Sequence, residues 1–274
     1  MYNAGYVFFT SATPFHLGKS TMTVLLGVYT GIYASTVTLI SVQFVYRYWA
    51  VFNLDNLKYF NNGKYGLWLL LCITVGSEWA GAFYVLKLDS YSEEYMSYDI
   101  FEKYGLLLNE TSALALVAYN TETGAPRFYN LLNTMNMTIV MGIIYIIIIY
   151  CAVRMHFEME EKILNYSSTL KTLHKQFFKT LIFQITTPTL TLFTPIMGLV
   201  YIPLFNLKVS LPVGFLISAI TSYPAMDAII IMYIVSDYRM AITGILKNTK
   251  RTVKGALGMK VEEMTMNTTM VVTL

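Results

Sequence analysis

Charged residues are scarce in this sequence. Asp, Glu, Lys and Arg make up 13% of its 274 residues, about half of the roughly 25% that is usual in soluble domains. Hydrophobic residues make up 55% and the mean hydropathy is +0.52, so the composition indicates a membrane protein. The net charge of +3 is too small to indicate nucleic-acid binding, and no basic cluster is interleaved with aromatic residues as in such sites.

Cysteine is also rare. Cys72 and Cys151 are the two cysteines, and both lie inside apolar runs. Structural disulfides normally lie in aqueous, oxidising surroundings. We therefore predict two free thiols that pack as small hydrophobic side chains.

The usual motifs of enzymes and transporters are missing as well. The sequence has no P-loop, GxSxG or HExxH motif, so we predict a protein that is not an enzyme and uses no cofactor. The histidines (His16, His156 and His174) are scattered along the chain, which disfavours a metal site. There is no repeat with a broken helix in each half, the pattern typical of transporters.

What the sequence does contain is long apolar runs. A membrane-spanning helix needs about 20 mostly apolar residues. Five stretches meet this requirement, at residues 21–45, 65–86, 136–153, 180–204 and 209–235. We therefore predict an all-α, multi-span transmembrane helix bundle within residues 1–245 and a cytoplasmic tail over residues 246–274.

The distribution of basic residues predicts the orientation. Of the 19 Lys and Arg residues, fourteen fall in the segments that follow the first, third and fifth spans, and five fall on the other side. Because Lys and Arg are enriched in cytoplasmic loops, we expect the N-terminus outside the cell and the C-terminus in the cytoplasm. Arg47 then lies at the cytoplasmic end of the first span.

The loop over residues 87–135 agrees with this topology, since it is acidic, rich in tyrosine and predicted to be outside. Asn109 begins the sequence NET in this loop, which matches the N-glycosylation pattern, so we predict a glycan there. Asn136 matches the pattern too but is expected to lie too close to the membrane for modification. Asn165 and Asn267 match it on the cytoplasmic side, where we expect no glycan.

Two spans carry features of helix packing. The first span has small or hydroxylated residues on one face, namely Gly27, Gly31, Ala34, Thr38 and Ser41, which predicts close packing and a central position in the bundle.

The fourth span contains Pro188 and Pro195, each of which removes a backbone hydrogen bond and kinks the helix. Nearby threonine hydroxyls can bond the freed carbonyls. The kink is either static or a hinge for the cytoplasmic half of the helix.

Two acidic residues lie at membrane depth, where ionisable groups almost always face the bundle interior or a water-filled cavity. Glu78 is a candidate for a ligand pocket, although a hydrogen bond to a neighbouring helix is the favoured interpretation. Asp227 is better placed for a polar network near Arg47. The guanidinium of Arg47 could also act as an anchor that extends to the lipid headgroups beside its aromatic neighbours.

Two motifs carry a resemblance to a known family. The sequence FVYRYWAVFN (residues 44–53) resembles the end of the third helix of nematode seven-transmembrane chemoreceptors of the Str type. SYPAMDAIIIMYIVSDYRMAI (residues 222–242) resembles the seventh helix of that family and the segment that follows it. The similarity covers about residues 20–245, and the five predicted spans match helices three to seven, with the first two helices absent.

The resemblance implies a G-protein-coupled receptor for a small odorant, in the plasma membrane of sensory-neuron cilia. Its implied partners are the lipid membrane, a small ligand and a heterotrimeric G protein. The family would place G-protein coupling and switch roles on seven residues: Tyr46, Arg47, Tyr48, Pro224, Asp227, Tyr238 and Arg239. The chain departs from the family in having Ala228, where a proline usually follows the aspartate. The alternative function is a non-signalling accessory subunit of intact receptors.

Overall fold

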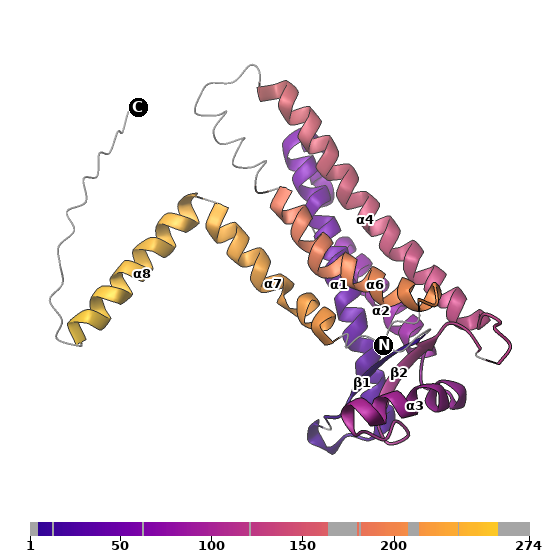
Figure 1. Ribbon diagram of the computed structural model, residues 1–274. Helices are drawn as coiled ribbons and strands as arrows, with labels where there is room; N and C mark the ends of the chain where they lie inside the picture. The colour runs from indigo at the N-terminus through magenta and orange to yellow at the C-terminus, as the bar shows by residue number, and fades with distance from the viewer. Residues whose placement is uncertain are drawn as a thin grey trace, which may run out of the picture.

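The computed structural model describes residues 5–12, 14–61, 63–120, 122–163, 180, 182–207, 214–234 and 236–256. These residues form a bundle of long helices with a small sheet and a short helix at one end (Figure 1). We call this the sheet end and the other the Arg47 end. The predicted fold class, an all-α multi-span bundle, is confirmed.

Four helices are long and apolar enough to cross a membrane within the described ranges, and each coincides with a predicted span. They are α1 (Lys19–Phe52), α2 (Tyr65–Val85), the Phe128–Glu158 part of α4 (Phe128–Ile163), and Ile182–Leu204. The last consists of residues 182–188, a π-helix η3 (Thr189–Phe193) and α6 (Thr194–Leu204). The fifth predicted stretch is α7 (Gly214–Ile234), whose 21 residues extend about 30 Å.

The helices extend further than the apolar runs predict. α4 begins at Phe128 rather than near residue 136 and continues to Ile163, and α1 has 34 residues. At 1.5 Å per residue, α1 is about 50 Å long, well beyond a hydrocarbon core of about 30 Å. Polar helix ends therefore continue past the bilayer, where hydropathy alone does not detect them.

The sheet end contains structure that the sequence did not predict. β1 (Gly5–Thr10) pairs antiparallel with β2 (Ser112–Val117), from Gly5 opposite Val117 to Thr10 opposite Ser112. A 3₁₀ turn η1 (Pro14–His16) follows β1, and α3 (Ser90–Tyr104) packs on β2. The segment over residues 87–135, interpreted as a loop, is therefore a small folded cap with its own core, formed by Val7, Met96, Leu108, Ala113, Ala115 and Val117.

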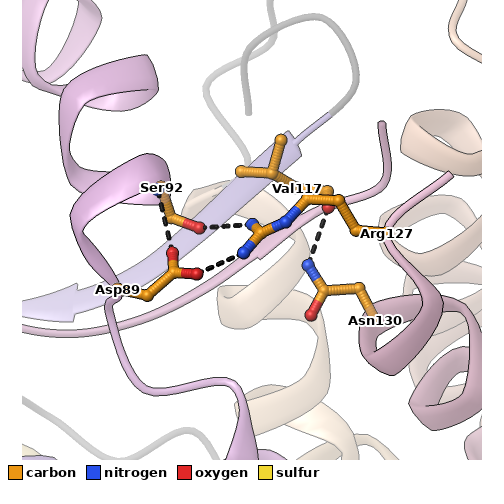
Figure 2. A network of polar contacts seen from close by, with 5 residues as sticks. All are labelled: Asp89, Ser92, Val117, Arg127 and Asn130. Atoms are coloured by element: carbon orange, nitrogen blue, oxygen red, sulfur yellow. Dashed lines mark hydrogen bonds and ion pairs between the residues drawn. The ribbon is translucent and has the colours of Figure 1, made fainter. Parts of the chain in front are cut away.

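A polar network fixes α3 to the start of α4 (Figure 2). Asp89 is the N-cap of α3 and accepts a hydrogen bond of 2.9 Å from the backbone N–H of Ser92. The Arg127 guanidinium donates to the Asp89 carboxylate and, at 2.9 Å, to the Ser92 hydroxyl. Partial burial by itself raises the pKa of Asp89, but the Ser92 hydrogen bonds and the Arg127 charge outweigh it and lower the pKa. Asn130 then bonds the Val117 carbonyl at 2.7 Å, which ties α4 to the sheet.

The predicted small-residue face of α1 is confirmed, because all five of its residues are buried. α2 crosses α1 there with little space between the backbones. A Cβ added to Gly31 would lie 2.5 Å from the carbonyl oxygen of Gly76. Ser35 strengthens the crossing by donating a hydrogen bond of 2.9 Å to the carbonyl of Cys72. α1 is thus the central helix of this part of the bundle.

The cysteine prediction is also confirmed, since Cys72 and Cys151 are both buried and free. Beyond α1, a 3₁₀ helix η2 (Leu54–Tyr59) leads toward α2. α8 (Ser236–Ala256) follows α7 without continuing its direction (Figure 1). The predicted tail over residues 246–274 is therefore helical at its start, and its remainder lies outside the described residues.

Candidate functional site

A cavity of about 70 Å³ lies in the half of the bundle next to the sheet. β1, α1, α2, α6 and α7 all contribute to its wall, with aliphatic side chains such as Leu199 and Ile220 on the last two helices. Its aromatic lining consists of Tyr6, Phe8, Tyr29, Tyr33, Trp79 and Phe83. None of the residues that line it is charged, so the site fits an uncharged and mostly apolar molecule.

The few polar groups of the lining differ in whether they are already bonded. The Tyr33 hydroxyl donates to the carbonyl of Leu192 at 3.2 Å, and the Thr30 hydroxyl donates to the carbonyl of Gly27 at 2.7 Å. The Trp79 side chain is 1% exposed, and its Nε1 has no acceptor among the described residues. Leaving a buried donor unpaired costs about 1–3 kcal/mol, but this N–H is buried within the wall rather than exposed to the cavity.

Glu78, the sequence candidate for this pocket, does not line the cavity. It lies on an exposed face of α2, and its carboxylate accepts a hydrogen bond from the Asn136 side chain on α4. The favoured interpretation, a hydrogen bond to a neighbouring helix, is confirmed. The sequence placed the right helix at the cavity but not the residues of that helix that line it, which are Trp79 and Phe83.

In the Ile182–Leu204 helix, Pro188 and Pro195 flank the π-helix η3. Hydroxyls in this helix bond its own carbonyls: Thr187 to Phe183 at 2.8 Å, Thr189 to Ile185 at 2.7 Å, and Thr191 to Thr187 at 2.8 Å. The prediction that threonine hydroxyls bond the carbonyls freed by the prolines is not met by these three bonds, because the carbonyls four residues before Pro188 and Pro195 belong to Gln184 and Thr191. The kink therefore has a structural basis, since a π-turn between two prolines interrupts the regular α-helical bonds. Whether Pro188 and Pro195 act as a hinge remains a prediction.

Neighbouring helices hold the π-helix on both sides. Tyr33 of α1 bonds the Leu192 carbonyl from the cavity side. From α4, the Tyr145 ring packs on Phe193 with 4.6 Å between centroids, and its hydroxyl lies 3.3 Å from Oγ1 of Thr189. Tyr33 therefore contacts both the cavity and the kinked segment.

At the other end of the same helix, Arg47 donates a hydrogen bond to Oε1 of Gln184, which is 6% exposed. Asp227 and Tyr223 of α7 lie within electrostatic range of the Arg47 guanidinium. Gln184 is a partner of Arg47 that the sequence analysis did not name, and the predicted network between Asp227 and Arg47 stays a prediction.

The residues beside Arg47 have separate contacts. Tyr46 is 46% exposed, and its ring meets Phe60 edge-on with 5.1 Å between centroids. The Tyr48 hydroxyl donates to Oε1 of Glu158 at 3.3 Å, linking α1 to α4, and the same oxygen pairs with Arg154 at 2.5 Å. The Tyr-Arg-Tyr sequence therefore directs its three side chains to three different neighbours.

The other predicted switch residues lie on α7 and α8. Pro224 is an exposed residue inside α7, one turn before Asp227. Arg239 is exposed on α8, and the side chain of Tyr238 lies outside the described part of the chain. At the sheet end, Asn109 is exposed in a turn, where its carbonyl accepts a hydrogen bond from Lys19. Among the described residues, no group of three or more His, Cys, Asp or Glu is arranged to hold a metal ion.

Comparison with known proteins was made against families, curated proteins and solved structures. The family model described as "Serpentine type 7TM GPCR chemoreceptor Str" matches residues 1–243, which includes the first strand as well as the region where the motifs lie. No solved structure matches the chain.

Two curated relatives come from the nematode Caenorhabditis elegans. The G-protein coupled receptor str-33 is 33% identical over 250 residues, which cover 88% of this chain and 72% of the relative. Serpentine receptor class r-10 is 29% identical over 229 residues, covering 82% of this chain and 67% of the relative.

Proposed function

Because this chain belongs to the Str family of serpentine seven-transmembrane chemoreceptors, we propose that it is a chemosensory receptor that binds a small odorant and activates a heterotrimeric G protein. The family is one of receptors rather than enzymes. The chain is a multi-pass membrane protein, and its proposed location is the plasma membrane of sensory-neuron cilia. The transmembrane domain covers residues 1–245.

The observation that carries the proposal is one helix that links the cavity to Arg47. The Ile182–Leu204 helix lines the cavity through Leu199 and bonds Arg47 through Gln184. Between these points lies the π-helix, which Tyr33 contacts from the cavity wall. A movement at one end of this helix can therefore be transmitted to its other end.

The proposed mechanism is a shift between two packings of the bundle. In the inactive packing of this proposal, the Arg47–Gln184 hydrogen bond holds the Arg47 end closed. A ligand that favours a different arrangement of the cavity wall moves the π-helix through Tyr33, and the segment below Pro188 swings away. Arg47 is then free to contact Asp227 or a G protein in the groove that opens.

The energy scale is suitable for a switch. A hydrogen bond to a charged group contributes about 1.5–3 kcal/mol, which corresponds to a ratio of roughly 10–150 between the two packings. A ligand shifts this equilibrium only by its difference in affinity for the two states. A small molecule in an apolar cavity can supply such a difference.

The membrane orientation belongs to the same proposal. The N-terminus and the sheet end face outside and the Arg47 end faces the cytoplasm, as the basic residues favour. Tyr238 and Arg239 then begin the cytoplasmic segment, and Asn109 is exposed on the outer side for glycosylation.

The proposal is tested with the purified full chain in lipid nanodiscs and a purified heterotrimeric G protein. We expect the chain to accelerate guanine-nucleotide exchange, and Arg47→Ala to abolish this effect. Gln43→Ala serves as the matched control, because it changes an exposed polar side chain one turn earlier on α1. If Arg47→Ala exchanges nucleotide as fast as the unchanged chain, the coupling role of Arg47 is wrong.

One observation favours the alternative of an accessory subunit. Glu78 and Asn136 form a polar pair on an exposed face between α2 and α4, whereas intramembrane carboxylates usually face a bundle interior. Such a pair suits contact with another membrane chain. Co-purification with a full-length relative that is lost in Glu78→Leu, together with no nucleotide exchange by the chain itself, would support this role.

A further inference from the structure

A groove of about 350 Å³ lies on the surface of the bundle at the Arg47 end, between the last turn of α1, η2 and the first turns of α2. Its wall is aromatic and aliphatic, formed by Trp49, Tyr59, Leu67, Trp68 and Leu71. Leu67 and Leu71 are 66% and 44% exposed, so the groove opens toward the surroundings of the bundle. We call it the Trp68 groove.

Contacts between rings hold the wall of the Trp68 groove in place. The Trp68 ring stacks on Phe60 with 4.8 Å between centroids, and Trp49 meets the same two rings edge-on at 6.0 Å and 5.7 Å. Trp68 Nε1 also donates a hydrogen bond of 3.1 Å to the carbonyl of Tyr59. Because this donor is already bonded and the rings brace one another, the groove has a preformed apolar wall.

Two lysines place positive charge at the rim of this groove. The ammonium groups of Lys58 and Lys64 lie 5.4 Å and 5.5 Å from the centroid of the Tyr59 ring. Both side chains are exposed, and among the described residues neither forms an ion pair with a carboxylate, including that of Asp55 in the same 3₁₀ helix as Lys58. An ammonium group has three N–H donors, of which a ring face occupies only part. The rim is therefore able to bind an anion.

The order of these groups along α2 matches the boundary of a bilayer. Lys64 is the N-cap of α2, and Leu67 and Leu71 follow one and two turns into this membrane-spanning helix. The charges then lie at the level of the headgroups, and the apolar wall continues about 10 Å toward the hydrocarbon core. A soluble anion would leave the apolar wall uncovered, and a neutral lipid would leave both cations without a counter-charge. The groove fits a molecule that combines an anionic head with an apolar chain.

We propose that the Trp68 groove binds an anionic phospholipid, with its charged headgroup at Lys58 and Lys64 and the start of an acyl chain along the apolar wall. Charge complementarity selects this occupant over a zwitterionic phospholipid or a sterol, since basic residues at the membrane surface attract anionic lipids. In the proposed orientation the groove faces the cytoplasmic leaflet, where these lipids are concentrated. The inference goes beyond the proposed receptor function and needs neither an odorant nor a G protein.

The test uses tryptophan fluorescence, because Trp49 and Trp68 line the groove whereas Trp79, the third tryptophan, is 1% exposed elsewhere in the bundle. The purified full chain is placed in phosphatidylcholine nanodiscs that contain increasing fractions of phosphatidylserine with bromine atoms on its acyl chains near the headgroup. Bromine quenches an indole that it contacts. Brominated phosphatidylcholine at the same fractions measures the quenching by lipids that are not selected.

We expect brominated phosphatidylserine to reach half of its maximal quenching at a fraction about 25-fold lower than brominated phosphatidylcholine, because each lysine near the surface contributes about fivefold. Lys58→Gln combined with Lys64→Gln should make the two quenching curves coincide. Both lysines are exposed, so this variant should keep the unfolding temperature of the unchanged chain.

Lys87→Gln combined with Lys247→Gln is the matched control, because it removes the same charge from two exposed lysines outside the groove. Lys87 even has the same type of contact, since its ammonium group lies 5.9 Å from the centroid of the Tyr84 ring at the other end of α2. This control should keep the full preference for phosphatidylserine.

A soluble headgroup and a sterol distinguish the other occupants. O-phosphoserine in excess carries the charges of the headgroup without acyl chains, and it should not displace brominated phosphatidylserine. Brominated cholesterol has no anionic head, and it should quench no more than brominated phosphatidylcholine at the same fraction.

Equal quenching by the two phospholipids, a preference that survives the double lysine variant, displacement by O-phosphoserine or stronger quenching by the sterol would each overturn the inference. Because these measurements contain no G protein, they separate the two proposals. A chain that selects phosphatidylserine without nucleotide exchange would contradict the signalling function alone. A chain that exchanges nucleotide without lipid selectivity would contradict the inference alone.

Discussion

The hydroxyl of Tyr33 on α1 donates a hydrogen bond of 3.2 Å to the main-chain carbonyl of Leu192, which lies 159 residues later in the chain. The Tyr33 ring lines the cavity, and Leu192 belongs to the π-helix between the two prolines. A single side chain therefore contacts both the candidate ligand site and the kinked segment. This relationship supports the proposed coupling of the cavity to Arg47.

Tyr33→Phe tests this coupling. The variant keeps the aromatic ring in the cavity wall and removes a hydrogen bond of about 0.5–1.5 kcal/mol. We expect an odorant that activates the unchanged chain to bind with nearly unchanged affinity, whereas its effect on nucleotide exchange falls about two- to tenfold. Both are measured on the purified chain with a G protein. Tyr84→Phe, a change at an exposed tyrosine of α2 outside the cavity, should leave both values unchanged, and an equal loss in the two variants would contradict the role of Tyr33.

Gln184→Ala tests the contact that holds the Arg47 end closed. The variant removes the hydrogen-bond acceptor of Arg47, so the closed packing loses about 1.5–3 kcal/mol relative to the open one. We expect nucleotide exchange without ligand to rise about tenfold or more. Gln43→Ala changes an exposed glutamine on α1 and should not raise it. Basal exchange that is the same in both variants would argue against a closing role for Gln184.

Gly76→Val tests the close crossing of α1 and α2. A Cβ at Gly76 would lie 2.8 Å from the carbonyl oxygen of Gly31, and such overpacking typically costs about 1–3 kcal/mol. The unfolding temperature of the variant should therefore fall by several degrees. Gly81→Val provides the comparison, because a Cβ at Gly81 meets nothing within 4 Å. A similar unfolding temperature for the two variants would show that the backbones are not in close contact.

Asn109→Gln tests the membrane orientation. The side chain is exposed in a turn at the sheet end, so expression in eukaryotic cells should add one glycan that this variant lacks. Asn136→Gln should leave the glycan in place, since the Asn136 amide is bonded to Glu78 on the side of α4. The readout is the change in gel mobility after N-glycosidase treatment. A glycan on Asn165 or Asn267 instead would reverse the proposed orientation.

The sequence predicted the features that the bilayer itself imposes. The apolar runs identify the long helices because about 20 residues must cross the hydrocarbon core, and the small-residue spacing on α1 identifies its buried face. The prolines and threonines likewise predict the kink. Each of these signals is local, so no knowledge of distant residues is needed.

The features that escaped prediction depend on partners far apart in the chain. β1 is a short apolar segment, and the strand with which it pairs, β2, lies more than a hundred residues later in the sequence. The bond between Tyr33 and Leu192 is equally non-local. Gln184 could have been identified from the sequence, because it is a polar residue in an apolar run at the depth expected for Arg47. Glu78 was the predicted pocket residue because it is the charged residue of α2, whereas the uncharged Trp79 beside it lines the cavity.

The central claim is that the Ile182–Leu204 helix moves at the Arg47 end when the receptor couples to a G protein. A direct measurement places spin labels at Phe157→Cys on α4 and Ile182→Cys, which are 62% and 46% exposed, in a background without Cys72 and Cys151. Their distance distribution is recorded by pulsed electron paramagnetic resonance. We predict that nucleotide-free G protein adds a population at longer distance and that Gln184→Ala adds it without G protein. A distribution that stays the same while G protein is bound would contradict the account.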